Sequence, residues 1–257
     1  SKLRAQVEAV DPEAYVRFLH GWHGIDQPSR HAAELLPVID SLQGYSVPSG
    51  VLENDVLRAR IDGYHEGDLD ALCASGRVVW TGNGSLGKDI RVQLYRREHM
   101  HLLHQANPPL EGELAGRIRE ILRARGGLFF EDLKQQVGGF PGDILDALLA
   151  LVRNGEVSND TLMPLRSLRR PVRAQRRGGR RQRNRSIRAS QSRLSGTEGR
   201  WWLVESIAGS APDPAARGLA VCTALLDRYG VLCREAFAAE SIRGGFSQYY
   251  PVLKALE

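Results

Sequence analysis

Three groups of residues have types and spacings that could do chemistry, and the first is the glycine-rich loop from Gly82 to Asp89. Its sequence, GNGSLGKD, has the glycine, four residues, glycine, lysine spacing of a phosphate loop. A phosphate loop also needs a serine or threonine after the lysine to hold magnesium, and a helix N-terminus behind it. Here Asp89 follows the lysine, and residues 90–95 alternate apolar and polar as a strand does. We therefore interpret the loop as a β-hairpin, in which Asn83 and Lys88 are candidate contacts to a nucleic-acid backbone.

The second group is the histidines, which cluster as His20 with His23 and as His99, His101 and His104. Zinc sites use four ligands, usually with cysteine or carboxylate partners at matched spacing, and no cysteine lies near either cluster. We therefore expect no metal site. No serine elbow or Cys-His spacing stands out either, so we assign no catalytic residue. Three cysteines without a Cys-x-x-Cys pair are interpreted as reduced core thiols of a cytoplasmic protein: Cys73, Cys222 and Cys233.

The third group is the arginines between residues 166 and 200. This segment holds 13 arginines and one acid, Glu198, so its local charge is +12. The chain has 35 basic and 30 acidic residues, which leaves 22 basic and 29 acidic residues, or −7, everywhere else. Guanidinium groups make forked hydrogen bonds to phosphate and release its counterions. The candidate nucleic-acid contacts in this segment are Arg173, Arg176, Arg177, Arg180, Arg181, Arg183, Arg185 and Arg188.

The segment has almost no apolar residues, so it cannot bury enough surface to fold alone. We expect residues 166–200 to be a flexible arm or linker. Two interpretations of its charge remain open: a sequence-independent contact to nucleic acid, and a solvated linker that binds nothing specifically.

The elements that would position these groups fall into repeated modules. In residues 1–105 the pattern predicts an amphipathic helix with Tyr15, Phe18, Leu19 and Trp22 buried, three further helices near 32–42, 51–62 and 67–74, and then the hairpin. Helices that end in a small hairpin are typical of a winged helix-turn-helix unit. A more compact copy follows at 110–165, with helices near 114–122, 129–137 and 145–152 and a strand at 156–159.

Residues 201–257 resemble the second module, because the Gly-Gly-Phe motif at 138–140 occurs again at 244–246. We expect a strand at 201–204 to open this third module, and its third helix to carry the candidate contacts Ser247 and Gln248. The module ends at Glu257 before any wing, and the chain starts without methionine, so we expect a fragment of a longer protein. The predicted fold class is mainly α, with tandem winged helix-turn-helix modules and small antiparallel β wings.

Hydropathy and charge argue against some classes of function. No stretch approaches the roughly 20 consecutive apolar residues of a membrane span, and the N-terminus has no secretory core. The predicted third helix of the second module carries Asp143 and Asp146, so major-groove reading by this helix is not favoured, and protein–protein packing is an equal use.

Several strings together resemble the C-terminal region of the bacterial large helicase-related family. They are DPEAYVRFL from Asp11, LPVIDSLQG from Leu36, GRVVWTGNGSLG from Gly76, NGEVSNDTL from Asn154 with Pro164-Leu-Arg, Gly199-Arg-Trp, and Gly244-Gly-Phe-Ser. The resemblance covers nearly the whole chain apart from the arginine segment.

The resemblance implies a family that joins an ATP-driven DNA helicase to a C-terminal extension of tandem winged helices and a β-barrel. That extension is similar to DNA glycosylases and is implicated in oligomerisation and, in some members, in uracil removal. No motor motif or barrel occurs in this chain, so no catalytic residue is carried over, and ATP and magnesium are expected only in missing motor domains.

We therefore expect a DNA-binding and assembly segment of a repair helicase that contacts a single strand or a tailed duplex, and the helicase core of the same protein. The alternatives are a structural module that self-associates as a homo-oligomer, and part of a glycosylase-like domain whose active site lies elsewhere.

Overall fold

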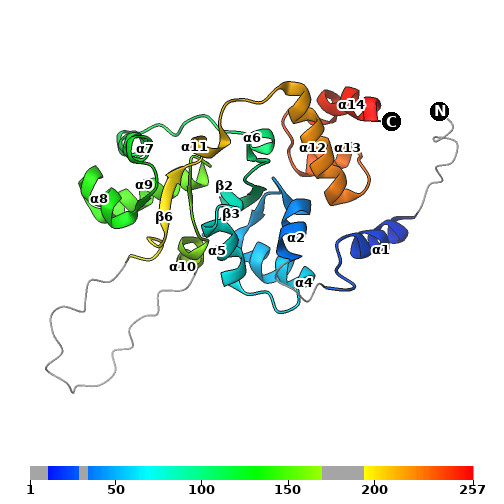
Figure 1. Cartoon of the computed structure of the whole chain (residues 1–257), viewed down its shortest axis with the longest axis horizontal. Coiled ribbons are helices and arrows are strands. Elements are labelled where there is room, and N and C mark those ends of the chain that lie inside the picture. Colours follow the sequence, from blue (N-terminus) through cyan, green and yellow to red (C-terminus); the bar gives the residue numbers. More distant parts are fainter. Residues whose placement is uncertain (1–10, 29–33, 170–193, 257) are drawn as a thin grey trace, which may run out of the picture.

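The computed structural model describes residues 11–28, 34–169 and 194–256. It contains three helical modules, and Figure 1 shows the first of them in the middle, with the second and third on either side. The fold class expected from the sequence is confirmed: most elements are helices, and the strands form two small antiparallel sheets. Among the described helices none is long and apolar enough to cross a membrane.

The first module follows the order helix, strand, helix, helix, strand, strand. Helix α2 lies where the sequence predicts a helix near 32–42, and it buries a stripe of four apolar residues, Leu35, Leu36, Ile39 and Leu42. The predicted hairpin is confirmed, since β2 and β3 pair antiparallel from Val78 opposite Arg96 to Leu86 opposite Asp89. The elements are α2 (Leu35–Leu42), β1 (Val47–Pro48), a continuous helix made of α3 (Ser49–Val51), η3 (Leu52–Leu57, π-helical) and α4 (Arg58–Arg60), α5 (Glu66–Ala74), β2 (Val78–Leu86) and β3 (Asp89–Arg96).

The second module repeats this order with one added helix, α10, between its last two strands, and the two sheets are built alike. The strand order is β1-β3-β2 in the first and β4-β6-β5 in the second, so the last strand lies in the middle of both. The elements are α7 (Glu113–Arg125), β4 (Leu128–Phe129), α8 (Phe130–Val137), α9 (Pro141–Arg153), β5 (Val157–Asn159), α10 (Met163–Arg169) and β6 (Arg200–Leu203).

Strand β6 corrects one boundary. The sequence places 201–204 at the start of the third module, but Trp201 lies opposite both Leu128 of β4 and Asn159 of β5. Its indole is fully buried in the core that the first two modules share. The strand was recognisable from its apolar residues, but pairing partners 40 to 70 positions away are not visible in a local pattern.

The third module consists of three helices, α12 (Pro214–Tyr229), α13 (Arg234–Ala239) and α14 (Gly245–Leu256). Asp213 caps α12 by accepting hydrogen bonds from the backbone N–H groups of Ala215 and Ala216, and Gly230 ends it in the left-handed conformation. Phe237 and Tyr249 lie at the centre of the module's own core. The short helices α6 (Met100–Leu103) and α11 (Glu205–Ala208) lie in the segments between modules.

Helix α1 (Pro12–Trp22) differs from the expectation of a buried stripe, because none of its residues is buried. It lies against the C-terminal end of α12, where the Tyr15 hydroxyl and the Trp22 indole donate to the carbonyls of Tyr229 and Asp227. Phe18 and Trp22 stack on each other and stay about half exposed.

The interpretation of the three cysteines as core thiols also needs correction at one position, since Cys73 and Cys222 are buried but Cys233 is exposed.

The first and second modules approach each other closely at Gly82. A Cβ atom built on this glycine would lie 1.9 Å from the Val152 carbonyl oxygen and 2.8 Å from its carbon. Val152 belongs to the last turn of α9, so the hairpin strand β2 packs directly against the backbone of α9. The first glycine of the phosphate-loop-like sequence is therefore required by helix packing.

Gly82→Ala is expected to destabilise the fold by about 2–3 kcal/mol, because the added methyl group would overlap the Val152 carbonyl and force β2 away from α9. Urea unfolding would measure the loss. Gly67→Ala is the matched control, since a Cβ at that position on α5 meets nothing within 4 Å. The control should be neutral or slightly stabilising, and equal midpoints for the two variants would contradict the packing role of Gly82.

Candidate nucleic-acid interface

The arginine-rich segment connects β5 to β6, two strands of one sheet. Asn159 of β5 lies opposite Trp201 of β6, so the stretch between them joins two paired strands, as the turn of the β2–β3 hairpin does in the first module. The segment is therefore a wing insertion of the second module and does not lead from one module to the next. Within it, residues 170–193 hold ten arginines and no acid.

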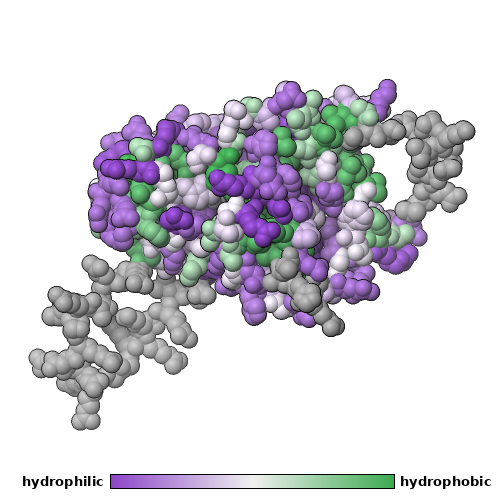
Figure 2. All heavy atoms as spheres, in the orientation of Figure 1, coloured by the Kyte–Doolittle hydropathy of each residue, from purple (hydrophilic) through white to green (hydrophobic). Residues whose placement is uncertain are grey.

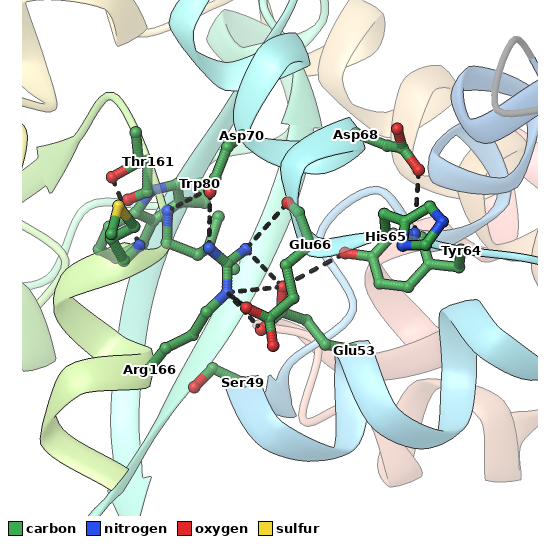
Figure 3. Close-up of polar contacts among 12 residues, drawn as sticks. Ser49, Glu53, Tyr64, His65, Glu66, Asp68, Asp70, Trp80, Thr161 and Arg166 are labelled. Atoms are coloured by element: carbon green, nitrogen blue, oxygen red, sulfur yellow. Dashed lines mark hydrogen bonds and ion pairs between the residues drawn. The ribbon is translucent and has the colours of Figure 1, made fainter. Parts of the chain in front are cut away.

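The first end of this wing is fixed by a buried ion-pair network around Arg166 of α10 (Figure 3). The guanidinium donates from Nη2 to Glu53 Oε1 at 2.6 Å and from Nη1 to Asp70 Oδ2 at 2.6 Å. The side chains of Arg166 and Glu53 are only 6% and 2% exposed. Glu53 also accepts from the Tyr64 hydroxyl at 3.2 Å. This network ties the second module to the helix 49–60 and to α5 of the first.

The electrostatics explain why these charges can be buried. Burial alone would lower the pKa of Arg166, but the hydrogen bonds that it donates to Glu53 and Asp70 outweigh burial and raise the pKa, so the guanidinium stays charged. Burial beside Glu53 raises the pKa of Tyr64, which therefore keeps its proton and donates a hydrogen bond to the carboxylate. All the members of the network already have partners, which leaves it no charge to offer to a phosphate.

Arg169 extends the network by one turn of α10. It donates to Glu53 Oε2 at 3.2 Å and lies 3.9 Å from Asp89. Asp89 in turn accepts from the Ser49 hydroxyl at 2.6 Å and from the Gly50 N–H at 2.9 Å, at the start of the helix 49–60. The carboxylate that argues against a phosphate loop thus caps a helix.

The second end of the wing is fixed by the turn that leads into β6. Asp160 accepts from the backbone N–H of Arg200 at 2.9 Å and from its guanidinium at 3.1 Å. Gly199 has a φ of +74°, and a Cβ there would lie 2.1 Å from the Asn159 side chain, so the turn requires glycine. Ser167 donates to Glu198 at 2.7 Å and joins the two ends.

These contacts correct the expected limits of the arm. Residues 166–169 form the end of a helix, and residues 194–200 form a turn and the start of a strand. Both stretches belong to the fold. The eight arginines proposed as contacts, from Arg173 to Arg188, lie outside the described residues, so their role stays a prediction.

The remaining candidate contacts lie on two other modules. Lys88 is exposed at the tip of the β2–β3 hairpin, and Asn83 is partly buried near its base. Ser247 and Gln248 are exposed on α14. Lys88 adjoins Asp89, which lies 3.9 Å from Arg169 at the end of α10, so this candidate lies beside one fixed end of the second module's wing. Asn83 and Gln248 instead border neighbouring hollows between the first and third modules.

The third helices of the three modules differ in charge. Helix α5 carries Glu66, Asp68 and Asp70, and the exposed side of α9 carries Asp143 and Asp146. Six residues of α9 are buried because it packs on both its own module and β2, so the side left exposed is the one that carries these two acids. By contrast, α14 has no acidic residue within 245–256.

The third module is attached to the first through Arg228 of α12. Its guanidinium donates to the carbonyls of Ser41 and Gln43 at the C-terminal end of α2, and pairs with the buried Glu240. It also lies 5.3 Å from the centre of the Tyr45 ring. Carbonyls at the end of a helix carry partial negative charge, so this is a favourable place for a cation.

A metal centre is not suggested by the part of the chain that the structure describes, which contains no group of three or more His, Cys, Asp or Glu side chains placed to hold an ion.

Comparison with known proteins identifies the family. Two family models match, both described as a winged-helix domain of the large helicase-related protein: the third such domain over residues 10–97 and the fourth over residues 211–257. The chain belongs to the large helicase-related (Lhr) family. The resemblance inferred from the sequence is thus confirmed, and the two Lhr domains matched are the first and third modules of the structure.

Two curated Lhr relatives align with most of the chain. The "Lhr helicase/ probable uracil glycosylase" of Mycolicibacterium smegmatis is 33% identical over 273 residues, which is 99% of this chain and 18% of that protein. The "Lhr helicase/uracil glycosylase" of Escherichia coli K12 is 31% identical over 246 residues, 87% of this chain and 16% of that protein. The chain therefore spans less than a fifth of the length of these Lhr proteins.

Sequence reasoning missed the residues that hold the Lhr modules together. Arg166, Arg169 and Arg228 are three of 31 arginines and stand in no motif of their own. Glu53 gives no signal of its own either, because Asn54, Asp55 and Arg58 make its surroundings in the sequence polar, and only the structure shows that it is buried.

Proposed function

We propose that this chain is the DNA-binding and assembly segment of a longer Lhr-type ATP-dependent helicase that acts in DNA repair. The observation that carries the proposal is the position of the arginine-rich segment in the wing of a winged helix, with both ends fixed to the folded body. A wing lies beside the helix pair that winged-helix proteins set against a duplex, so ten arginines at this position can reach phosphates.

The contact we propose is sequence-independent. The helices α5 and α9, which would read bases in the first two modules, are acidic on their exposed sides and repel phosphate. The chain outside residues 166–200 is also acidic overall, at −7. The ligand is DNA with single-stranded character, either a single strand or a tailed duplex, bound through its backbone. ATP and magnesium would serve the motor domains of the longer protein.

Replacing all ten arginines of residues 170–193 by glutamine is expected to weaken binding to a tailed duplex at least about tenfold at low salt, because the phosphate contacts and their counterion release are lost. Fluorescence anisotropy at several KCl concentrations measures both affinity and its salt dependence. The slope of log K against log salt should become shallower by about 0.7 to 0.9 for each phosphate contact removed.

The matched control replaces Arg58 and Arg77, which are exposed on the first module, by glutamine. This variant should keep nearly the full affinity and slope. If the wing variant bound with unchanged affinity and an unchanged slope, the proposed role of the wing would be wrong.

Self-association is the second candidate function, and helix α1 favours it. Val16, Phe18 and Trp22 are 52%, 41% and 50% exposed on this one helix. Figure 2 shows further apolar surface over the third module, where Leu219 and Val231 are also exposed. Neighbouring exposed apolar side chains favour protein–protein contact.

Sedimentation velocity over a range of concentrations tests this second function. We expect species larger than the 28.5 kDa monomer, and Val16→Lys should shift the equilibrium toward monomer. Leu86→Lys, at the exposed tip of the hairpin, is the control and should leave the equilibrium unchanged. A monomer at every concentration would count against self-association through α1.

A further inference from the structure

A groove separates the first module from the third. Its deeper part is a cavity of about 220 Å³ between β3 on one side and α12 with residues 240–243 on the other. A shallower hollow adjoins it, lined by Arg217, Gln248 and Tyr249. Gln105 and Arg243 border both parts, so they form one continuous depression, which we call the intermodule groove.

Amide side chains dominate the polar lining of the intermodule groove. Some of them serve the fold: Gln93 donates from its amide nitrogen to the Gly44 carbonyl at 2.6 Å, and Asn107 donates to the Asn154 carbonyl at 3.0 Å. Among the described residues, Gln105 and Asn83 make no side-chain hydrogen bond, and the Gln93 carbonyl oxygen is also unused. The amides of the groove are Gln43, Asn83, Gln93, Gln105, Asn107 and Gln248.

An amide offers a donor and an acceptor side by side, which matches the donor and acceptor pairs on the Watson–Crick edge of a nucleobase. The Watson–Crick edge is available only when the base is unpaired, because pairing uses it. The one acid that lines the deep part, Glu240, is paired with Arg228, and the remaining charge, Arg243, lies at the border that the deep part shares with the shallow part. Its chemistry therefore fits an uncharged polar ring better than a free anion.

The shallow part of the groove is positively charged. Arg243 donates to the Ala106 carbonyl at 3.1 Å and to Asn107 at 2.8 Å, and Arg217 donates to the His104 carbonyl at 2.9 Å. A guanidinium has five N–H donors, so each arginine retains several for a ligand. Burial lowers the pKa of His104 to about 4, and the charges of Arg217 and Arg243 contribute to this shift.

We propose that the intermodule groove binds one unpaired nucleotide, with its base against the amides of the deep part and its phosphate beside Arg217 and Arg243. This site goes beyond the wing contact proposed above, because it uses two other modules and none of residues 170–193. It gives the chain a means to hold single-stranded DNA that electrostatic contact alone does not provide.

Photo-cross-linking tests the site directly. A single-stranded oligonucleotide with 4-thiothymidine is irradiated with the whole chain, and the linked peptides are identified by mass spectrometry. We expect links within residues 103–107 and 240–249. Thymidine monophosphate should compete better than thymidine, and thymidine better than inorganic phosphate. Links confined to residues 170–193 would support the wing contact and overturn the groove; the absence of any link, with no binding in anisotropy, would overturn both.

Two substitutions close or alter the deep part. Ala224→Met fills it from α12, and Gln105→Leu removes an unused amide at similar volume. Each should weaken thymidine monophosphate binding, measured by NMR titration, at least fivefold while leaving the salt slope of the wing contact intact. Ala216→Met, on the exposed side of the same helix, is the control and should bind normally. Unchanged binding by both groove variants, with melting temperatures equal to the parent, would overturn the proposal.

Discussion

Arg166→Met is expected to lower the free energy of unfolding by about 3–5 kcal/mol, because removal of one partner leaves a buried charge uncompensated. Glu53, which is 2% exposed, would lose its bidentate partner, and Asp70 would lose a 2.6 Å hydrogen bond. For a chain of this size the loss corresponds to a fall in melting temperature of roughly 10 °C. Differential scanning calorimetry and urea unfolding would measure it.

The matched control is Arg123→Met. Arg123 pairs with Glu205 at 2.7 Å, but both side chains are more than half exposed, so this change should cost less than about 1 kcal/mol. Adding Glu53→Gln to Arg166→Met should recover part of the stability, since the stranded charge disappears. The network would have no special role if Arg166→Met cost no more than Arg123→Met, or if Glu53→Gln made it worse.

The same network links the fold to the proposed wing contact. Because Arg166 and Arg169 fix the helix from which residues 170–193 begin, Arg166→Met should also loosen the start of the wing. Arg166 touches no ligand, so any effect of this change on the proposed DNA contact would act through the position of the wing alone.

Arg228→Met is expected to release the third module from the first, with a loss of about 3–5 kcal/mol for the same reason. Glu240 is 4% exposed and would keep its charge without a partner, and the carbonyls of Ser41 and Gln43 would lose their donor. Hydrogen exchange should show the effect locally, as faster exchange along α12 and at the end of α2. Lysine at this position should restore only part of the stability, because an ammonium cannot reach three separate acceptors and the Tyr45 ring at once.

Arg234→Met is the control within the same module. Arg234 is exposed and lies over the Phe246 ring, a contact that contributes about 1 kcal/mol or less. The double variant Arg228→Met with Glu240→Gln should be more stable than Arg228→Met alone. If exchange along α12 were the same in Arg228→Met as in the parent, the guanidinium would not be what holds the modules together.

Local patterns in the sequence were sufficient for the elements and for the family. The apolar stripe of α2, the alternation of residues 90–95 and the Gly-Gly-Phe repeat predicted helices, a hairpin and tandem modules that the structure contains. These features depend on neighbours within a few positions, so a linear pattern reports them. The family strings added the correct resemblance.

The same patterns failed where distant segments meet. The sequence predicted residues 201–204 correctly as a strand, but only the sheet shows that this strand belongs to the second module. The sequence also predicted a buried stripe on α1, whose aromatic residues Phe18 and Trp22 are about half exposed. The Gly82 loop carried a plausible phosphate-loop spacing, and only the approach of Val152 explains its first glycine.

The sequence by itself determined that this protein is a set of winged helices with a charge of +12 concentrated in residues 166–200. The tertiary structure decided which of the described arginines belong to the fold. Arg166 and Arg169 pair with carboxylates 80 or more positions away, while residues 170–193 fall in the chain between two strands of one sheet. The reason is physical: a guanidinium has the same sequence signature whether it faces water, phosphate or a buried acid, and only its burial and partners, which depend on long-range packing, distinguish the three.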